Sequence, residues 1–262
     1  MTPSFSNNTA LTSSSTHQSP TTDRSRFTFQ HPWFEEVRHE WEDQTASLRG
    51  KPLRILEIGC FEGASTTWIL DNLVDHLNSR MTAIDHFGGG MEHKGGDASV
   101  ENYDLYDLEA RFKENVNKCR NVDKLRVLKQ DSQIALLDLV QEGARFDFIY
   151  IDGSHVALDV LQDALLSWQM LKIGGTIVFD DWNWKGYLQD CYNPRIAIIS
   201  FLRCAEPEIE WTKMESQVWV TRVKNNLEAT KNPDPEMIYP VDYLRNFLSD
   251  NEEAKSGSHG RG

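Results

Sequence analysis

The stretch LRILEIGCFEG, residues 53–63, decides the fold because it joins a buried strand to a glycine turn. Its first half, Leu53–Ile58, is rich in Leu and Ile, which predicts a strand buried on both faces. Glu57 lies near the carboxyl end of that strand, where open α/β sheets bind ligands, and Gly59 and Gly63 follow it. We therefore predict that Glu57 supplies a negatively charged acceptor to a ligand. The alternative is an ordinary strand-to-helix turn with an incidental glutamate.

Strand and helix patterns alternate from this stretch onward, and repeated units of this kind predict a parallel sheet covered on both faces. The alternation ends at IEWTKMESQVWVTRV, residues 209–223, where two alternating runs predict a hairpin. The expected fold class is α/β: a Rossmann-like, doubly wound, mostly parallel seven-stranded sheet with a C-terminal antiparallel hairpin. The predicted strands are Leu53–Ile58, Met81–Ile84, Leu125–Leu128, Phe146–Ile151 and Thr176–Phe179, and the predicted helices are Phe29–Leu48, Ala64–Leu77, Leu105–Cys119, Gln133–Val140, Ala157–Leu171 and Pro194–Cys204.

The composition indicates one acidic domain with a polar segment at each end. The 262 residues include 27 Lys and Arg against 40 Asp and Glu, a net charge of -13, and no basic run, which argues against a nucleic-acid partner. We predict a leader at 1–26, disordered or a transit segment, a domain at 27–224, and a polar tail at 225–262 with a short helix in MIYPVDYLRNFL. No apolar run approaches the roughly 20 residues that span a bilayer, and the cysteines form no Cys-x-x-Cys pair. A soluble, cytoplasmic protein with reduced thiols and no membrane partner is expected.

Five motifs carry a family resemblance: LEIGCFEG (56–63), AIDHF (83–87), LKQDS (128–132), FDFIYIDGSH (146–155) and GGTIVFDDW (174–182). With the alternating strands and helices, they resemble the class I S-adenosylmethionine (SAM)-dependent methyltransferases, in particular the metal-dependent small-molecule and sugar O-methyltransferases of methyltransferase family 24. A nicotinamide-dependent dehydrogenase would instead show Gly-x-Gly-x-x-Gly, which this sequence lacks. The resemblance implies that SAM is held by Glu57, Gly59, Cys60, Phe61, Gly63, Asp85, His86, Asp131, Ser132 and Asp152.

Acidic residues end the second and third predicted strands. Asp85 is placed to accept hydrogen bonds from ribose hydroxyls, although Asp is also a common turn former. Asp131 and Ser132 would by resemblance hold the adenine end of SAM. An Asp-Ser pair before a helix is equally natural as an N-cap, so both roles stay open.

Three carboxylates are expected to converge at the next two strand ends. Asp152 follows the strand Phe146–Ile151, and Asp180 and Asp181 follow the next strand. Because three uncompensated acids repel one another, a divalent cation is expected between them, and oxygen ligands suit Mg²⁺ or Ca²⁺. The resemblance likewise implies an ion that grips the acceptor hydroxyl. The alternative is that Asp180 and Asp181 only keep a loop solvated while Asp152 faces SAM.

His155, on the turn that enters the next predicted helix, is the candidate catalytic base. A neutral imidazole can take the proton of an acceptor hydroxyl as its oxygen attacks the methyl carbon. The matching histidine of the sugar O-methyltransferases that the sequence resembles is the base there. A lone histidine near a helix start is more often a surface or capping residue, which is the alternative.

Two further features lie near these acids. Trp182 and Trp184 would floor an aromatic or sugar acceptor site, or cover the core. The insertion Phe87–Tyr106 is long for a connection in a compact domain, which predicts a lid whose Glu92 or His93 meets the acceptor or a metal. A plain surface excursion is the alternative.

These observations predict a SAM-dependent methyltransferase that transfers a methyl group to a hydroxyl of a small-molecule acceptor. A divalent cation, Mg²⁺ by preference, would assist, and His155 would accept the proton. Two alternatives stay open: a metal-independent N- or C-methyltransferase, and a catalytically idle methyltransferase-like protein that only binds a partner.

Overall fold

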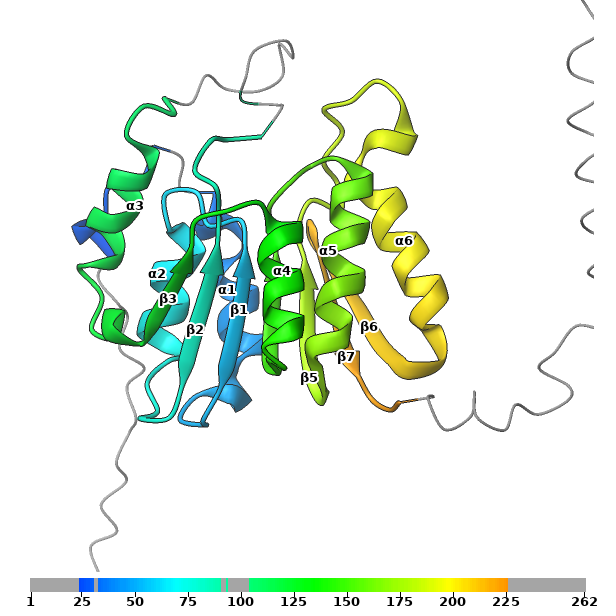
Figure 1. Ribbon diagram of the computed structural model, residues 1–262, viewed down its shortest axis with the longest axis horizontal. Coiled ribbons are helices and arrows are strands. Elements are labelled where there is room, and N and C mark those ends of the chain that lie inside the picture. Colours follow the sequence, from blue (N-terminus) through cyan, green and yellow to red (C-terminus); the bar gives the residue numbers. More distant parts are fainter. Residues whose placement is uncertain (1–23, 31–32, 91–92, 94–103, 226–262) are drawn as a thin grey trace, which may run out of the picture.

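The computed structural model describes residues 24–30, 33–90, 93 and 104–225, arranged around one seven-stranded sheet (Figure 1). The strands are β1 Arg54–Ile58, β2 Arg80–Ile84, β3 Leu125–Leu128, β4 Phe146–Ile151, β5 Leu171–Phe179, β6 Ile209–Met214 and β7 Gln217–Arg222. Their order is β3-β2-β1-β4-β5-β7-β6. The first five run parallel, and β7 is antiparallel to both β5 and β6. The expected Rossmann-like sheet with its hairpin is confirmed.

Helices cover both faces of this sheet. One face carries α1 Phe34–Gln44, α2 Ala64–Asn72 and α3 Leu108–Val116, and the other carries α4 Ser132–Gln141, α5 Ala157–Met170 and α6 Pro194–Ala205, which stand in front in Figure 1. Because successive strand residues alternate between faces, β4 sends Phe148 to the first core and Ile149 to the second. Both side chains are fully buried, so the doubly wound arrangement rests on two separate apolar cores.

The strand order places a topological switch at the centre of the sheet. From β1 the chain moves outward to β2 and β3, and it then crosses back to β4 on the other side of β1. In open α/β sheets the crevice beyond the carboxyl ends of the strands at such a point is the usual ligand position. The site is therefore expected between the ends of β1 and β4.

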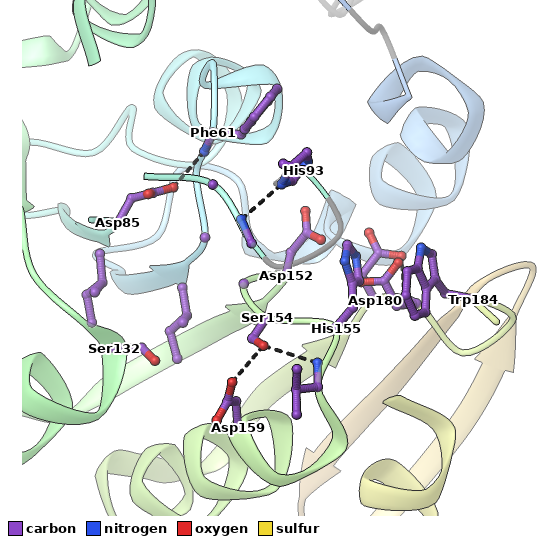
Figure 2. A pocket seen from close by; sticks show the side chains of 18 of the residues that line it. Phe61, Asp85, His93, Ser132, Asp152, Ser154, His155, Asp159, Asp180 and Trp184 are labelled. Atoms are coloured by element: carbon purple, nitrogen blue, oxygen red, sulfur yellow. Dashed lines mark hydrogen bonds and ion pairs between the residues drawn. The ribbon is translucent and has the colours of Figure 1, made fainter. Parts of the chain in front are cut away.

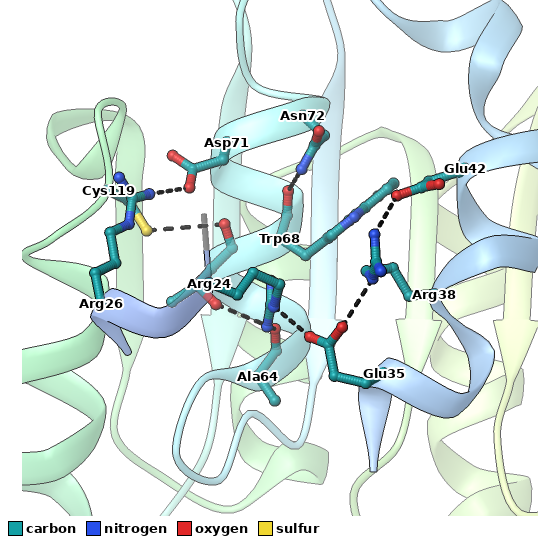
Figure 3. Close-up of polar contacts among 11 residues, drawn as sticks. Arg24, Arg26, Glu35, Arg38, Glu42, Ala64, Trp68, Asp71, Asn72 and Cys119 are labelled. Carbon is teal, nitrogen blue, oxygen red and sulfur yellow. Dashed lines mark hydrogen bonds and ion pairs between the residues drawn. The ribbon is translucent and has the colours of Figure 1, made fainter. Parts of the chain in front are cut away.

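The segment before α1 is fastened to the domain by ion pairs (Figure 3). A short 3₁₀ turn, η1 Arg24–Arg26, places Arg26 against the buried carboxylate of Asp71 on α2. Arg24 pairs with Glu35 of α1 and donates a hydrogen bond of 2.8 Å to the carbonyl oxygen of Ala64. η1, which the expected division placed in the leader, thus contacts α1 and α2. Residues 1–23 and the helix expected within the C-terminal tail lie outside the described residues.

Element boundaries differ from the sequence expectation mainly at helix ends. The strands β3 and β4 have the expected bounds. The helix α2 ends at Asn72 instead of Leu77, because the amide groups of Leu73 and Val74 both bond to the carbonyl of Ile69 and the last turn opens. The strand β5 begins at Leu171, earlier than expected, and its register with β4 is irregular near its start.

Two further expectations concern membrane-spanning helices and disulfides. No helix among the described residues is long and apolar enough to cross a bilayer. All four cysteines are described and none is in a disulfide; Cys60 and Cys119 are buried, and Cys191 and Cys204 are exposed.

Candidate active site

A cavity of about 840 Å³ opens at the carboxyl ends of β1, β2, β4 and β5 (Figure 2). It extends from Gln130, before α4, to Lys185 and Ser216 near the hairpin. The cavity thus includes the crevice at the topological switch. Of the residues that the sequence nominated, it is lined by Gly59, Phe61, Asp85, His86, Asp131, Ser132, Asp152, His155, Asp180 and Asp181.

Glu57 is not among these lining residues. Its side chain is fully buried, and its two carboxylate oxygens accept hydrogen bonds from the hydroxyls of Ser65 and Thr66, both at 2.5 Å. Burial raises the pKa of Glu57 to about 7, against the lowering effect of the two hydroxyls. Glu57 therefore fastens the first turn of α2 to β1, and its expected contact with a ligand stays a prediction.

The two glycines of the turn make room for the chain itself. Gly59 has φ 80°, and a Cβ there would lie 2.0 Å from the carbonyl oxygen of Asp152, so glycine lets the ends of β1 and β4 meet. Gly63, with φ 85°, is the N-cap residue of α2, and a Cβ there would crowd the ring of Phe112 at 3.2 Å. Cys60 lines only a small neighbouring cavity of about 20 Å³, and burial raises the pKa of its thiol well above the ordinary range.

Asp85 organises the turn after β1. Its Oδ2 accepts hydrogen bonds from the amides of Cys60 and Phe61, each at 2.9 Å, and its Oδ1 accepts one from the amide of Phe87 at 2.6 Å. Phe61 is held at φ 44°, a region that bulky residues rarely adopt. A carboxylate offers about four acceptor positions, and the Cys60 thiol also bonds to Asp85. The structure thus shows the turn-forming role of Asp85, and its contact with ribose hydroxyls stays a prediction.

The residues that precede α4 form the far end of the cavity. Asp131 is the N-cap residue, with φ -60° and ψ 140°, but its side chain makes no capping hydrogen bond. Ser132 begins α4 and its hydroxyl bonds to the carboxyl group of Asp163 on α5, which is 1% exposed. Burial raises the pKa of Asp163 to about 7. His86 accepts a hydrogen bond of 2.8 Å at Nδ1 from the amide of Gly88.

Tyr150 joins two of the three acids at the ends of β4 and β5. Its hydroxyl lies 2.5 Å from Oδ2 of Asp180 and 3.1 Å from Oδ2 of Asp152, and Gln217 donates to Asp180 at 3.2 Å. A phenol has one proton, so one of the two contacts requires a proton on a carboxyl group. Burial, followed by the charges of Asp180 and Asp181, raises the pKa of Asp152 well above its usual range. Burial, followed by the charge of Asp181, raises the pKa of Asp180 to about 6.

His155 lies beside the third acid. Its Nε2 is 2.9 Å from Oδ2 of Asp181, whose φ of 63° is in the left-handed region and whose amide donates to Oδ1 of Asp180 at 2.8 Å. The indole of Trp184 stacks on the imidazole, with ring centroids 4.5 Å apart and planes 8° apart (Figure 2). Trp182 packs instead against the core that α6 covers. Trp184 therefore lines the site, whereas Trp182 covers the core.

The acids were also tested as a metal site. Their oxygen donors suit Mg²⁺ chemically. As the side chains lie, however, Asp181 turns to His155, and Asp180 is engaged by Tyr150 and Gln217. Within the described part of the chain no group of three His, Cys, Asp or Glu residues is arranged to hold a metal ion. The arrangement of these side chains does not fit a metal site of three carboxylates.

Part of the expected lid can be placed. His93 lines the cavity, its Nδ1 accepts a hydrogen bond of 2.9 Å from the amide of Gly90, and its ring stacks on Phe61 at 5.4 Å. Glu92 and residues 94–103 lie outside the described residues. His93 thus stacks on the glycine turn, and the lid itself stays a prediction.

Several residues of the site were missed in the sequence. Tyr150 had a signal, since it precedes Asp152 by two positions on one strand and such residues share a face. Gln217 had none: it begins β7 and links the acids to α1 through a hydrogen bond of 2.9 Å from Nε1 of Trp41. Lining residues from α1, from the start of α5 and from the loops also had no site role assigned from the sequence: Trp33, Glu36, Val37, Ser154, Asp159, Lys185 and Gly186.

The sequence and fold can be compared with known proteins. The family profile described as "Methyltransferase domain" matches residues 56–182. No curated protein matches the sequence. Among solved structures, the O-methyltransferase from Bacillus cereus in complex with S-adenosylhomocysteine (SAH) is 17% identical with a TM-score of 0.51, and the match covers 76% of this chain and 84% of that one. The O-methyltransferase TomG from Streptomyces achromogenes, involved in tomaymycin synthesis and solved with SAM, is 14% identical with a TM-score of 0.51, over 71% and 80% of the two chains.

A longer protein also has a similar fold. The MycE methyltransferase from the mycinamycin biosynthetic pathway, in complex with Mg and SAH, is 17% identical with a TM-score of 0.48 over 77% of this chain and 52% of that one. This chain therefore spans about half the length of MycE. At these identities the structural likeness establishes the fold alone.

The matched domain and the confirmed sheet together give the class of the protein. Residues 56–182 carry the methyltransferase-domain sequence, and they run from β1 to the acids after β5. We therefore assign residues 56–182 to a methyltransferase domain, built on a sheet of the class I methyltransferase type.

Proposed function

We propose that this chain transfers the methyl group of SAM to a hydroxyl group of a small molecule. The observation that supports this most directly is that the His155 and Asp181 pair lies in the same cavity as Gly59 and Asp85 of the methyltransferase motifs. Transfer to a hydroxyl needs a base close to the bound cofactor, and here the candidate base and the turn expected to bind SAM line the same cavity. The volume of about 840 Å³ is near the upper end for single-ligand sites, which suits a cofactor with an acceptor beside it.

In this proposal SAM lies across the ends of β1, β2 and β4. Asp85 accepts from the ribose hydroxyls, and Asp131 and Ser132 hold the adenine end. Of the two strand-end carboxylates nominated for SAM, Asp152 lines the cavity and Glu57 does not, so we assign the ammonium group of SAM to Asp152. His86 and Phe61 line the walls, while Cys60 and Gly63 support the turn from behind.

Methyl transfer is a direct displacement. The acceptor oxygen forms a bond to the methyl carbon, the bond from that carbon to sulfur breaks, and its electron pair stays on sulfur to give SAH. His155 takes the hydroxyl proton, and the carboxylate of Asp181 stabilises the resulting imidazolium. Positioning alone can lower such a barrier by about 7 to 11 kcal/mol, so a modest base suffices.

Metal assistance is the finer part of this proposal. The family resemblance nominates Asp152, Asp180 and Asp181 as ligands of a divalent cation, Mg²⁺ by its preference for oxygen. Binding by all three would require Asp181 to leave His155. Methyl transfer measured with added Mg²⁺ and with EDTA decides this part.

The test begins with binding and proceeds to turnover. Calorimetry with SAM and SAH should show one site per chain, and Asp85→Asn should weaken binding. Radiolabelled methyl transfer to a panel of phenols and monosaccharides should then be lost in His155→Asn with SAM binding retained. Absence of SAM binding by the native chain overturns the whole proposal, and undiminished transfer by His155→Asn removes the base.

Two alternatives separate in the same experiment. Transfer to amines or carbon acids that is indifferent to EDTA would support a metal-independent N- or C-methyltransferase. Tight SAM binding without transfer to any class would support an idle binding protein. The base paired with Asp181 favours the hydroxyl acceptor over both. A cytoplasmic location stays a prediction.

A further inference from the structure

Trp184 covers the face of the candidate base. Its indole stacks on His155 with centroids 4.5 Å apart, and Tyr187 meets the same indole edge-on at 5.1 Å. Figure 2 shows the indole and the imidazole side by side at the cavity wall. Asp181 contacts the edge of the same imidazole, with its Oδ2 2.9 Å from Nε2 of His155. The plane of the imidazole is therefore set by the indole while Asp181 holds its edge.

Gly186 leaves the space that this indole occupies. A Cβ at position 186 would lie 2.2 Å from both Cη2 and Cζ2 of Trp184, far inside any tolerated contact. The φ of Gly186 is outside the left-handed region that favours glycine. Backbone conformation therefore gives no reason for glycine here, and the space needed by Trp184 does.

The loop around Gly186 is fastened on both sides, so it cannot move away to relieve such a clash. The buried Asn193 accepts a hydrogen bond from the amide of Tyr187 at 3.1 Å and donates to the carbonyls of Tyr187 and Gln189. Arg195 donates to the carbonyl of Trp182 at 2.8 Å and lies over its ring. With the backbone held, an added side chain at position 186 must displace the indole.

We propose that Gly186 is a positioning residue of this site: it admits Trp184, which fixes the imidazole plane of His155 against Asp181. The catalytic consequence rests on the proposed function, whereas the positioning itself does not. A side chain at position 186 displaces the indole and thereby releases the imidazole from its stack. The effect is indirect, because Gly186 touches neither His155 nor Asp181 in any described contact.

The first test needs no acceptor. The ring resonances of His155, assigned with His155→Asn, should be shifted upfield by the stacked indole in the native chain. They should lose that shift in Gly186→Ala and in Trp184→Leu, and the rate at which diethyl pyrocarbonate modifies His155 should rise several-fold in both. The control Leu188→Ala changes a fully exposed side chain of the same loop and should change neither. Native resonances and native reactivity in Gly186→Ala overturn the proposal.

A double variant protects the test against misfolding. Since Gly186→Ala acts by displacing the indole, Gly186→Ala in a Trp184→Leu background should add nothing to Trp184→Leu alone. This double variant should fold even if Gly186→Ala does not, because the clash has been removed. Additive effects on His155 reactivity would show that Gly186 acts by another route.

The catalytic arm uses SAM binding to separate the two proposals. Calorimetry should give the native SAM affinity in Gly186→Ala, while kcat falls about 10 to 100-fold, since a displacement of about 1 Å near the chemistry costs up to about 10²-fold. If the native chain binds no SAM, the proposed function fails and the resonances of His155 still decide the positioning. If the native chain is active and Gly186→Ala keeps its kcat, the positioning has no catalytic role.

Discussion

The two halves of the cavity rim satisfy their carboxylates in different ways. Around the turn after β1, Asp85 accepts three backbone amides, and Glu57, behind the cavity, accepts two hydroxyls. At the ends of β4 and β5, Asp152 and Asp180 share the one hydroxyl of Tyr150, and Asp180 also accepts from Gln217 and from the amide of Asp181. The acids of the first half have separate donors from the chain. In the second half two acids meet at one phenolic proton, and there a proton, a cation or a substrate amine would be taken up.

The largest expected effect is on the free energy of unfolding, and it tests the close approach of Gly59 to Asp152 that joins the two halves. In Gly59→Ala, the new Cβ would meet the backbone of Asp152 at 2.0 Å, and φ 80° adds a conformational cost. We expect a loss of about 4 kcal/mol or more in the free energy of unfolding, at the upper end for single substitutions. Urea unfolding followed by circular dichroism measures it.

The matched control for that variant is Gly174→Ala. Gly174 has φ 79° but nothing within 4 Å of its Cβ position, so only the conformational cost of about 1 to 2 kcal/mol applies. Equal losses in the two variants would show that the ends of β1 and β4 do not depend on this close approach.

A second prediction extends the comparison to Asp163, an acid behind Ser132 whose pKa burial raises to about 7. Between its ordinary pKa and about 7 the folded chain keeps a proton that the unfolded chain releases, so stability falls as pH rises through this window and levels off above it. At about 1.4 kcal/mol per pKa unit, the fall amounts to a few kcal/mol. Asp163→Asn should flatten the profile of unfolding free energy between pH 4 and pH 8, as measured by urea unfolding.

The control for Asp163 is Asp138→Asn, which changes an exposed acid on α4. Its profile should keep the native slope. A native slope in Asp163→Asn would assign the pH dependence to other acids, such as Glu57.

A third prediction removes the hydroxyl that Asp152 and Asp180 share. Tyr150→Phe leaves Asp152 and Asp180 without the hydroxyl between them, and a buried group that loses its partner costs about 1 to 3 kcal/mol. The loss should be larger at pH 8 than at pH 5, because protonated carboxyl groups can donate to each other. Thermal unfolding at the two pH values checks this, with the exposed Tyr106→Phe as the control. A loss that is equal at both pH values would mean that Tyr150 does not separate charged acids.

The sequence predicted which strand ends carry the acids better than it predicted what those acids contact. The convergence of Asp152, Asp180 and Asp181 on one rim followed from strand ends, because parallel strands share an edge. The inward turn of Glu57 did not follow, since the same position suits a ligand contact or a bond to hydroxyls of the next helix. The stack of Trp184 on His155 and the space at Gly186 depend on a loop held by Asn193, and no periodicity encodes that.

The smallest expected effect concerns a hydroxyl partner of Glu57, in the half around the turn after β1. Thr66→Val removes a hydroxyl from Glu57, and Thr67→Val removes a hydroxyl from the backbone carbonyl of Ala64. Hydrogen bonds to charged groups contribute about 1.5 to 3 kcal/mol and neutral ones about 0.5 to 1.5 kcal/mol. Because the pKa of Glu57 is about 7, Thr66→Val should cost about 1 kcal/mol more than Thr67→Val at pH 8.5, and the two should converge at pH 5.5. Urea unfolding at both pH values measures the difference, and a gap that persists at pH 5.5 would mean that Glu57 stays ionised and that its burial is compensated by more than its two hydroxyl partners.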